Sequence, residues 1–146
     1  MKLLFVCTGN TCRSPMAQAI FADMAKGSGI DFNISSAGLH AQDGAHASEN
    51  AVLACRETGL DLSGHTSRAV SGEDIACADL FAVMTMPHAQ ALMARGVAKD
   101  KIYILNVSDP FGGDLQVYRD CRDEIRDRLI VLLELIKRQG QEERHE

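Results

Sequence analysis

The segment VCTGNTCRSP, residues 6–15, combines residue types that can bind an oxyanion and attack it. It ends an apolar run and precedes a sequence typical of a helix, so a tight loop would aim backbone N–H groups at one point. Those groups and the helix dipole would bind a tetrahedral oxyanion and stabilise Cys7 as a nucleophilic thiolate. Arg13 adds a planar guanidinium that matches two phosphate oxygens, and Gly9 permits the close turn. The segment therefore predicts phosphoryl transfer to a cysteine.

Two other interpretations of this segment have less support. The spacing C-x5-R also occurs by chance, and a buried structural Cys7 beside a surface Arg13 would have the same sequence. The strand-like run before the loop and the Ser-Pro after it favour the phosphate-binding interpretation. A nucleotide-binding loop would need G-x-x-x-x-G-K-[ST], whose lysine is absent.

A second polar loop, SDPFGG at residues 108–113, offers the acid that such a reaction requires. The leaving group must gain a proton, and the hydrolytic water must then lose one. Asp109 is the candidate for both steps, in a turn held by Pro110 and kept open by two glycines. Asp-Pro alone is usually only a turn, so this interpretation requires that the loop lies beside residues 7–14.

The elements that must position these two loops alternate between apolar strands and helices. We expect strands at 2–7, 32–37, 79–84 and 101–105, and helices at 15–27, 48–58, 87–95 and 114–138, with a polar loop at 60–72 and a short helical piece capped by Ser71. This alternation predicts an α/β domain with a mostly parallel four-stranded sheet flanked by helices. Ligands bind at the carboxyl ends of such strands, where residues 7–14 and 106–113 lie.

Length and charge limit the remaining possibilities. The 146 residues, 46% of them hydrophobic, fit one domain over residues 1–146, in which the polar tail 139–146 is expected to fray. The net charge of −5 argues against nucleic acid or an acidic membrane as a partner. No apolar run approaches the roughly 20 residues of a membrane helix, and residues 3–7 are too short for a signal peptide. We expect a cytoplasmic protein, and nothing requires more than a monomer.

The five cysteines are an odd number without a repeated C-x-x-C pattern, which favours reduced thiols over a disulfide framework or a structural zinc site. Cys55, Cys77 and Cys121 are expected to pack in the core. His65 and Arg68 are expected to be ordinary loop residues, with gating of the cleft as the alternative. His88, near the start of a helix, receives no function.

Together these motifs resemble the low-molecular-weight protein tyrosine phosphatases, over essentially the whole chain. CTGNTCRSP at 7–15, SSAG at 35–38 and SDPFGG at 108–113 stand in the order and separation of that family. The resemblance implies that Cys7 becomes phosphorylated, that Arg13 binds phosphate and that Asp109 is acid and then base. It places the phosphate-binding loop at Thr8, Gly9, Asn10, Thr11, Cys12 and Ser14, with Ser36 as support. In that family Asn10, Ser14 and Ser36 would hold the loop shape, and Ser14 would bind the thiolate. The resemblance implies phosphorylated proteins as substrates and neither a metal nor a cofactor.

The same resemblance bears on the substrate. Relatives specific for phosphotyrosine carry a bulky aliphatic residue at the position of Thr11 and paired aromatics after Asp-Pro, whereas here Phe111 is followed by two glycines. The chain looks more like the bacterial protein-arginine phosphatases, in which this threonine is implicated in selecting phosphoarginine. A hydroxyl can engage a guanidinium or order a water, while an isoleucine only packs on a ring. Phosphoarginine is the predicted substrate, and phosphotyrosine is the alternative.

Cys12 has two interpretations. It could form a reversible disulfide with Cys7 that protects the nucleophile, as in some relatives, or it could pack beneath the loop.

Three other functions fit part of the sequence. An arsenate reductase of similar fold would need two further redox cysteines in the middle of the chain, where residues 76–90 supply only Cys77. A non-catalytic phosphocysteine carrier would leave Arg13 and Asp109 without a role. A general acid phosphatase would prefer free metabolites to phosphoproteins.

Overall fold

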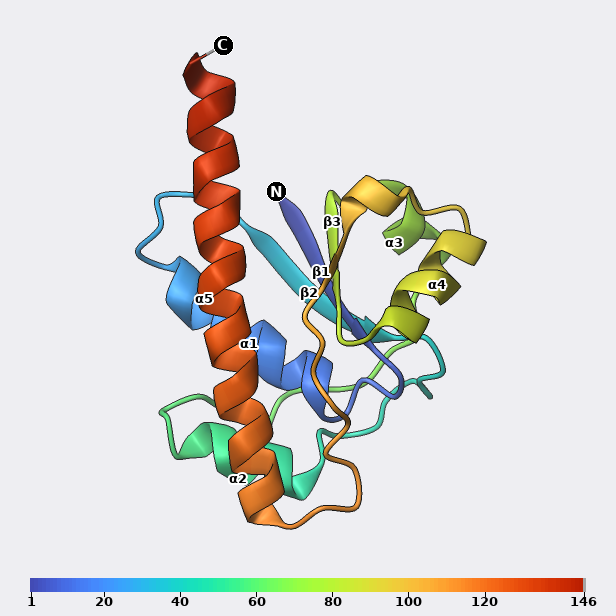
Figure 1. The fold of residues 1–146 in the computed structure, drawn as a ribbon. Helices are drawn as coiled ribbons and strands as arrows, with labels where there is room; N and C mark the ends of the chain where they lie inside the picture. Colours follow the sequence, from blue (N-terminus) through green and yellow to red (C-terminus); the bar gives the residue numbers. More distant parts are fainter. Residues whose placement is uncertain (146) are drawn as a thin grey trace.

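The computed structural model describes the backbone of residues 1–145, and its centre is a parallel sheet of four strands (Figure 1). The strands are β1 (Lys2–Cys7), β2 (Asn33–Gly38), β3 (Leu80–Val83) and β4 (Ile102–Ile104), in the order β2-β1-β3-β4. Every neighbouring pair is parallel. The predicted α/β fold with a four-stranded parallel sheet is therefore confirmed.

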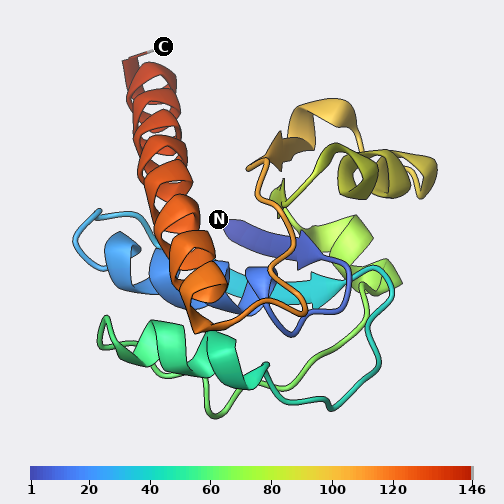
Figure 2. The ribbon, with the colours of Figure 1, turned by 60° about the horizontal axis from the view of Figure 1, so that its bottom comes forward.

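Helices cover both faces of this sheet. One side carries α1 (Arg13–Ala25), α2 (Glu49–Arg56) and α5 (Leu115–His145), and the other carries α3 (Gly72–Cys77) and α4 (Met86–Ala94). A 3-10 turn, Lys99–Lys101, precedes β4. On the first side α2 packs against α1 and α5, below the sheet in Figure 2. This arrangement leaves the carboxyl ends of the strands free for loops.

The central strand β1 is buried on both faces. Leu3 and Phe5 pack into the core that contains Phe21 of α1, while Leu4 and Val6 pack into the core that contains Leu92 of α4. A strand between two helical layers needs apolar side chains on both faces, which explains the continuous apolar run KLLFVC. Cys7 is consequently delivered to the carboxyl edge of the sheet by its most firmly packed strand.

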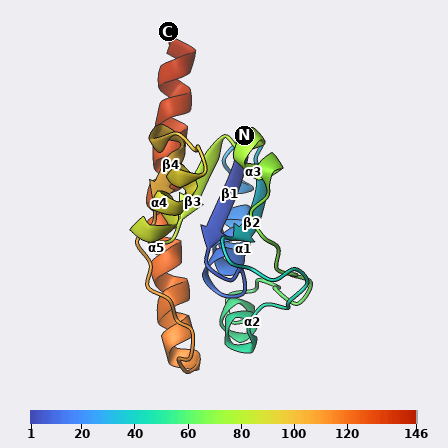
Figure 3. The same cartoon turned by 90° about the vertical axis from the view of Figure 1, so that its right-hand side faces the viewer.

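Several helix boundaries differ by one or more residues from those expected, and two of the differences have a physical explanation. Helix α1 begins at Arg13 rather than at residue 15. Pro15 lies in the first turn, where backbone N–H groups have no acceptor within the helix, so its missing N–H does not interrupt the helix. Helix α5 does not end at residue 138 but continues to His145, so residues 139–145 of the tail expected to fray are helical. Gln, Glu and Arg are good helix formers, and they extend α5 past the sheet (Figure 3). Residue 146 lies outside the described residues.

The polar loop expected at 60–72 precedes α3, and Ser71 caps that helix by accepting a bond from the Asp74 N–H at 3.1 Å. Within residues 1–145, none of the helices combines the length and the apolar character needed to cross a bilayer.

Gly38, at the end of β2, lies against the loop that follows β1. A Cβ at residue 38 would lie 2.5 Å from the Thr8 carbonyl oxygen and 3.0 Å from the Asn10 backbone nitrogen. Both are backbone atoms, so the loop itself would have to move to make room. We expect Gly38→Ala to lower the free energy of unfolding by about 1–3 kcal/mol in urea denaturation. Gly64→Ala is the control, because nothing lies within 4 Å of its added Cβ. Equal losses in the two variants would contradict the close approach.

Candidate active site

Cys7 ends β1 and lies at the base of the loop that leads to α1. Its sulfur is 2.9 Å from the Ser14 hydroxyl and accepts a hydrogen bond from the Asn10 N–H at 3.3 Å. The side chain is only 3% exposed, so neither contact competes with bulk water. Two donors aimed at one sulfur form the arrangement that can stabilise a thiolate.

The shape of this loop depends on Asn10, which is fully buried and has a φ of 56°. Its side-chain nitrogen, Nδ2, donates to the hydroxyls of Ser14 at 2.7 Å and Ser36 at 3.0 Å. Its side-chain oxygen accepts from the Arg68 backbone N–H at 3.1 Å, and its carbonyl accepts from the ring of His65 at 2.7 Å. Four contacts therefore hold a left-handed conformation that asparagine tolerates better than most residues. The structure brings Asn10, Ser14 and Ser36 together, while their role in binding phosphate stays a prediction.

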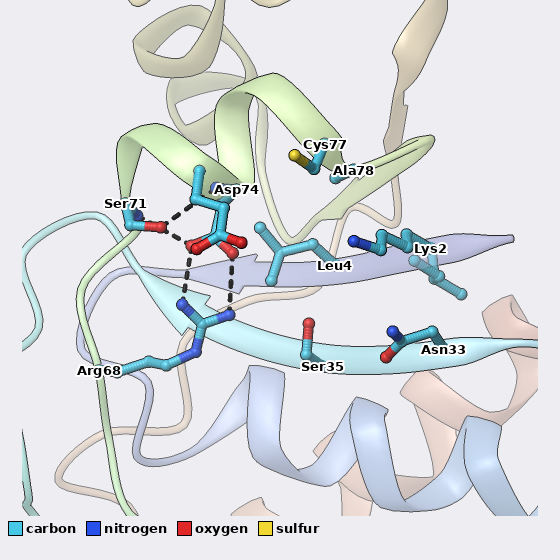
Figure 4. Close-up of a pocket in the computed structure, with 11 residues that line it drawn as sticks. Lys2, Leu4, Asn33, Ser35, Arg68, Ser71, Asp74, Cys77 and Ala78 are labelled. Atoms are coloured by element: carbon cyan, nitrogen blue, oxygen red, sulfur yellow. Dashed lines mark hydrogen bonds and ion pairs between the residues drawn. The ribbon is translucent and has the colours of Figure 1, made fainter.

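The Arg68 side chain forms an ion pair with Asp74 of α3, shown in Figure 4. The two guanidinium nitrogens lie 2.7 and 3.1 Å from the carboxylate oxygens. Burial alone would raise the pKa of Asp74, but the bonds from Arg68 and Ser71 outweigh it and hold that pKa below its usual value. The pair lines a hollow of about 270 Å³ on the α3 side of β1 and β2, away from Cys7. The ion pair holds Arg68 in place, so that its backbone N–H can donate to the side-chain oxygen of Asn10.

Arg13 and Asp109 meet beside Cys7. Arg13 is 4% exposed, donates to the Val107 carbonyl at 3.0 Å and lies 3.8 Å from the Asp109 carboxylate. Asp109 in turn accepts from the Phe111 N–H at 3.1 Å, and half of its side chain remains exposed. These residues line a hollow of about 280 Å³, with Cys7, Thr8, Gly9, Thr11 and Cys12 on its other walls. The two loops expected at one sheet edge do lie together there.

Cys12 is buried, and its sulfur contacts side chains at the start of α2 and in α5. Its sulfur is 3.4 Å from the Ser48 hydroxyl and 3.3 Å from the Tyr118 hydroxyl. Burial, and then the bond to Cys12, raise the pKa of Tyr118 to about 12, so this phenol stays protonated. All five cysteines are free thiols, and the structure thus describes the reduced protein. The redox role of Cys12 stays a prediction.

Sequence reasoning misplaced or missed some residues. Cys77 is exposed rather than in the core, because the short helix α3 that it ends buries none of its residues. His65 was expected to be an ordinary loop residue, yet it supports Asn10. The loop that carries His65 has no periodicity, so only the histidine itself signalled a possible role. His88 is buried against Thr8 of the loop, at a helix start that gave no functional signal.

Comparison with known proteins identifies the family. The sequence model described as "Low molecular weight phosphotyrosine protein phosphatase" matches residues 2–142. The chain belongs to this family. As a low-molecular-weight phosphatase it is an enzyme that acts on phosphoproteins, and its four-stranded sheet is the fold of that family.

Similar members of the low-molecular-weight phosphatase family carry two activities in their names. A protein-arginine-phosphatase of Bacillus subtilis (strain 168) is 38% identical over 148 residues, which cover 94% of this chain and 98% of that protein. The tyrosine phosphatase PtpB of Staphylococcus haemolyticus is 35% identical and covers 86% of this chain and 92% of its own. A solved structure of YwlE arginine phosphatase, a cysteine-to-serine mutant with a phosphorylated active-site serine, is 37% identical with a TM-score of 0.88, covering 94% and 96% of the two chains.

The buried thiols of this phosphatase are expected to resist alkylation. Burial raises the pKa of Cys55 to about 11 and that of Cys121 to about 12, although the charge of Arg122 acts against this at Cys55 and that of Arg13 at Cys121. At pH 8 only about one Cys55 thiol in a thousand would be a thiolate. Iodoacetamide should therefore modify the exposed Cys77 in the native protein and leave Cys55 and Cys121 unmodified, as read by mass spectrometry of peptides. In urea all three should react alike. Native labelling of Cys55 as fast as Cys77 would contradict this burial.

Proposed function

We propose that the chain is a protein-arginine phosphatase that hydrolyses phosphoarginine on proteins through a phosphocysteine intermediate. The observation that carries the proposal is the hollow that joins the Cys7 sulfur, the Arg13 guanidinium and the Thr11 side chain. The first two groups supply phosphoryl chemistry. Thr11 supplies a polar wall at the place where the phosphorylated side chain would enter.

In the proposed first step, the Cys7 thiolate attacks phosphorus. An S–P bond forms while the P–N bond to the substrate guanidinium breaks. Asp109 gives its proton to the departing nitrogen, and Arg13 neutralises the equatorial oxygens. Arg13 is held for this task by the Val107 carbonyl, which fixes one of its terminal nitrogens at 3.0 Å. The products of this step are phosphocysteine and an arginine side chain.

In the proposed second step, water attacks the phosphocysteine and Asp109 accepts its proton. The S–P bond breaks, the Cys7 thiolate returns and inorganic phosphate leaves. The Asn10 N–H and the Ser14 hydroxyl, both within hydrogen-bond distance of the sulfur, stabilise the thiolate as it departs. In this cycle Asp109 gives a proton to the leaving group in the first step and regains one from the water in the second.

Thr11 supports phosphoarginine as the substrate. Among the residues that the structure describes, its hydroxyl makes one long contact, 3.7 Å to the Cys12 sulfur, so it remains available to a ligand. A guanidinium brings several N–H donors that a hydroxyl oxygen can accept, whereas a phenol ring gains little from a polar wall.

One observation favours phosphotyrosine as a second candidate. Phe111 is 81% exposed on the rim of the hollow, where an aromatic ring could stack on a phenol. An arsenate reductase has less support. Among the described residues Cys12 is the one cysteine besides Cys7 that lines the hollow, so the two further redox cysteines are missing there.

Loss of Asp109 is expected to depend on the leaving group. In a series of aryl phosphates, Asp109→Ala should lower kcat/KM, which reports the first step, about 10²–10⁴-fold for leaving groups that need a proton and far less for nitrophenolate, which does not. The measurement is kcat/KM against leaving-group pKa, with a steeper slope in the variant. Asp120→Ala, which removes an exposed carboxylate on α5, is the matched control, and Cys7→Ser gives the background rate. Equal losses across the series would contradict the acid role.

Selectivity is expected to depend on the Thr11 hydroxyl. The wild-type enzyme should cleave a phosphoarginine peptide faster than a phosphotyrosine peptide, and Thr11→Ile should lower the ratio of the two kcat/KM values at least tenfold. Thr11→Val separates loss of the hydroxyl from added bulk, and Thr11→Ser should retain the preference. Faster cleavage of phosphotyrosine by both wild type and Thr11→Ile would instead make this a tyrosine phosphatase.

A further inference from the structure

His88 is fixed in one protonation state by the start of α4. Its Nδ1 lies 3.2 Å from the Thr85 backbone nitrogen and 2.9 Å from the Thr85 hydroxyl. A backbone N–H can only donate, so Nδ1 must accept and carries no proton. In a neutral ring the proton is then on Nε2.

The other side of the ring faces Thr8, the first residue after Cys7. Nε2 lies 2.8 Å from the Thr8 hydroxyl oxygen and, because it carries the proton, donates to it. The Thr8 hydroxyl therefore keeps its own proton for another acceptor, and accepting one bond makes it a stronger donor. The Thr8 carbonyl accepts from the His40 N–H at 2.9 Å, so Thr8 is held by both its side chain and its backbone.

The surroundings of His88 keep this arrangement at neutral pH. The residue is 7% exposed. Burial first, then the positive charge of Arg13, lower the pKa of His88 to about 4, with His40 acting in the same direction and Asp109 in the opposite one. Since this pKa lies well below 7, the ring is neutral in the working enzyme and the direction of the bond to Thr8 persists.

We propose that His88 is a positioning residue that orients the Thr8 hydroxyl as a hydrogen-bond donor to a main-chain carbonyl of the phosphorylated protein. Thr8 is exposed and lines the hollow, while the phosphate position at Cys7 is buried. A main-chain carbonyl is an acceptor that every protein substrate brings and that a small aryl phosphate lacks. The pair thereby favours phosphoproteins over free phosphate esters. This inference rests on the proposed phosphatase function.

The test compares a phosphopeptide with a small aryl phosphate in wild type, His88→Ala and His88→Gln. His88→Ala should lower kcat/KM for the peptide about tenfold more than for the aryl phosphate, mainly through KM, which is the size expected for one hydrogen bond. His88→Gln keeps an N–H that can reach Thr8, and it should recover most of the loss. Thr8→Val should show the same selective loss, and adding it to His88→Ala should cause no further selective loss.

The outcomes separate this inference from the proposed function. No hydrolysis of either substrate by the wild-type enzyme would refute the phosphatase proposal itself. Normal wild-type hydrolysis, with His88→Ala reducing both substrates equally, would overturn the positioning role and leave the phosphatase intact. Circular dichroism melting curves check that His88→Ala is folded. If it is not, Thr8→Val decides, because valine has the shape of threonine with a methyl group in place of the hydroxyl.

Discussion

The left-handed conformation of Asn10 is the constraint on which the rest of the site depends. For an L-residue this conformation costs about 1–2 kcal/mol, so it persists only where surrounding contacts offset that cost. The Asn10 side-chain amide and backbone carbonyl meet three partner residues from two segments that are distant in sequence: Ser36 on β2, and His65 and Arg68 in the loop before α3. Because the same turn aims the Asn10 N–H at the Cys7 sulfur, the backbone strain and the chemistry share one residue.

The edge of the sheet supports this conformation of Asn10. Cys7 pairs with Gly38 across β1 and β2, and Gly38 has no side chain to obstruct the Thr8 carbonyl and the Asn10 nitrogen. Its N–H donates to the Arg68 carbonyl at 2.9 Å, which holds the loop before α3 against the same edge. The Arg68–Asp74 pair then anchors that loop to α3. Neighbouring strands and one partly exposed ion pair thus position the loop before any ligand binds.

Sequence alone predicted what periodicity and local motifs encode. The apolar runs gave the four strands, and the spacing of Cys7, Arg13 and Asp109 gave the groups that the structure brings into one hollow. The contacts of His65 and His88 could not be predicted, because each depends on a pairing 55 or 80 residues away in the chain. The prediction that Cys77 is buried was wrong, because Cys77 ends a six-residue helix that lies on the surface and buries none of its residues.

In the proposed function, the groups around the Cys7 sulfur are separate from the side chains that would select the substrate. Asn10 donates to both Ser14 and Ser36, and Ser14 contacts the Cys7 sulfur, so changing any of the three disturbs the groups around that sulfur. Thr11 and Phe111 line the same hollow, yet their side chains take no part in those bonds. Side chains on the wall can therefore change while the phosphate-binding backbone stays as it is. A single scaffold can in this way serve phosphoarginine and phosphotyrosine, which accounts for relatives of similar identity named for either activity.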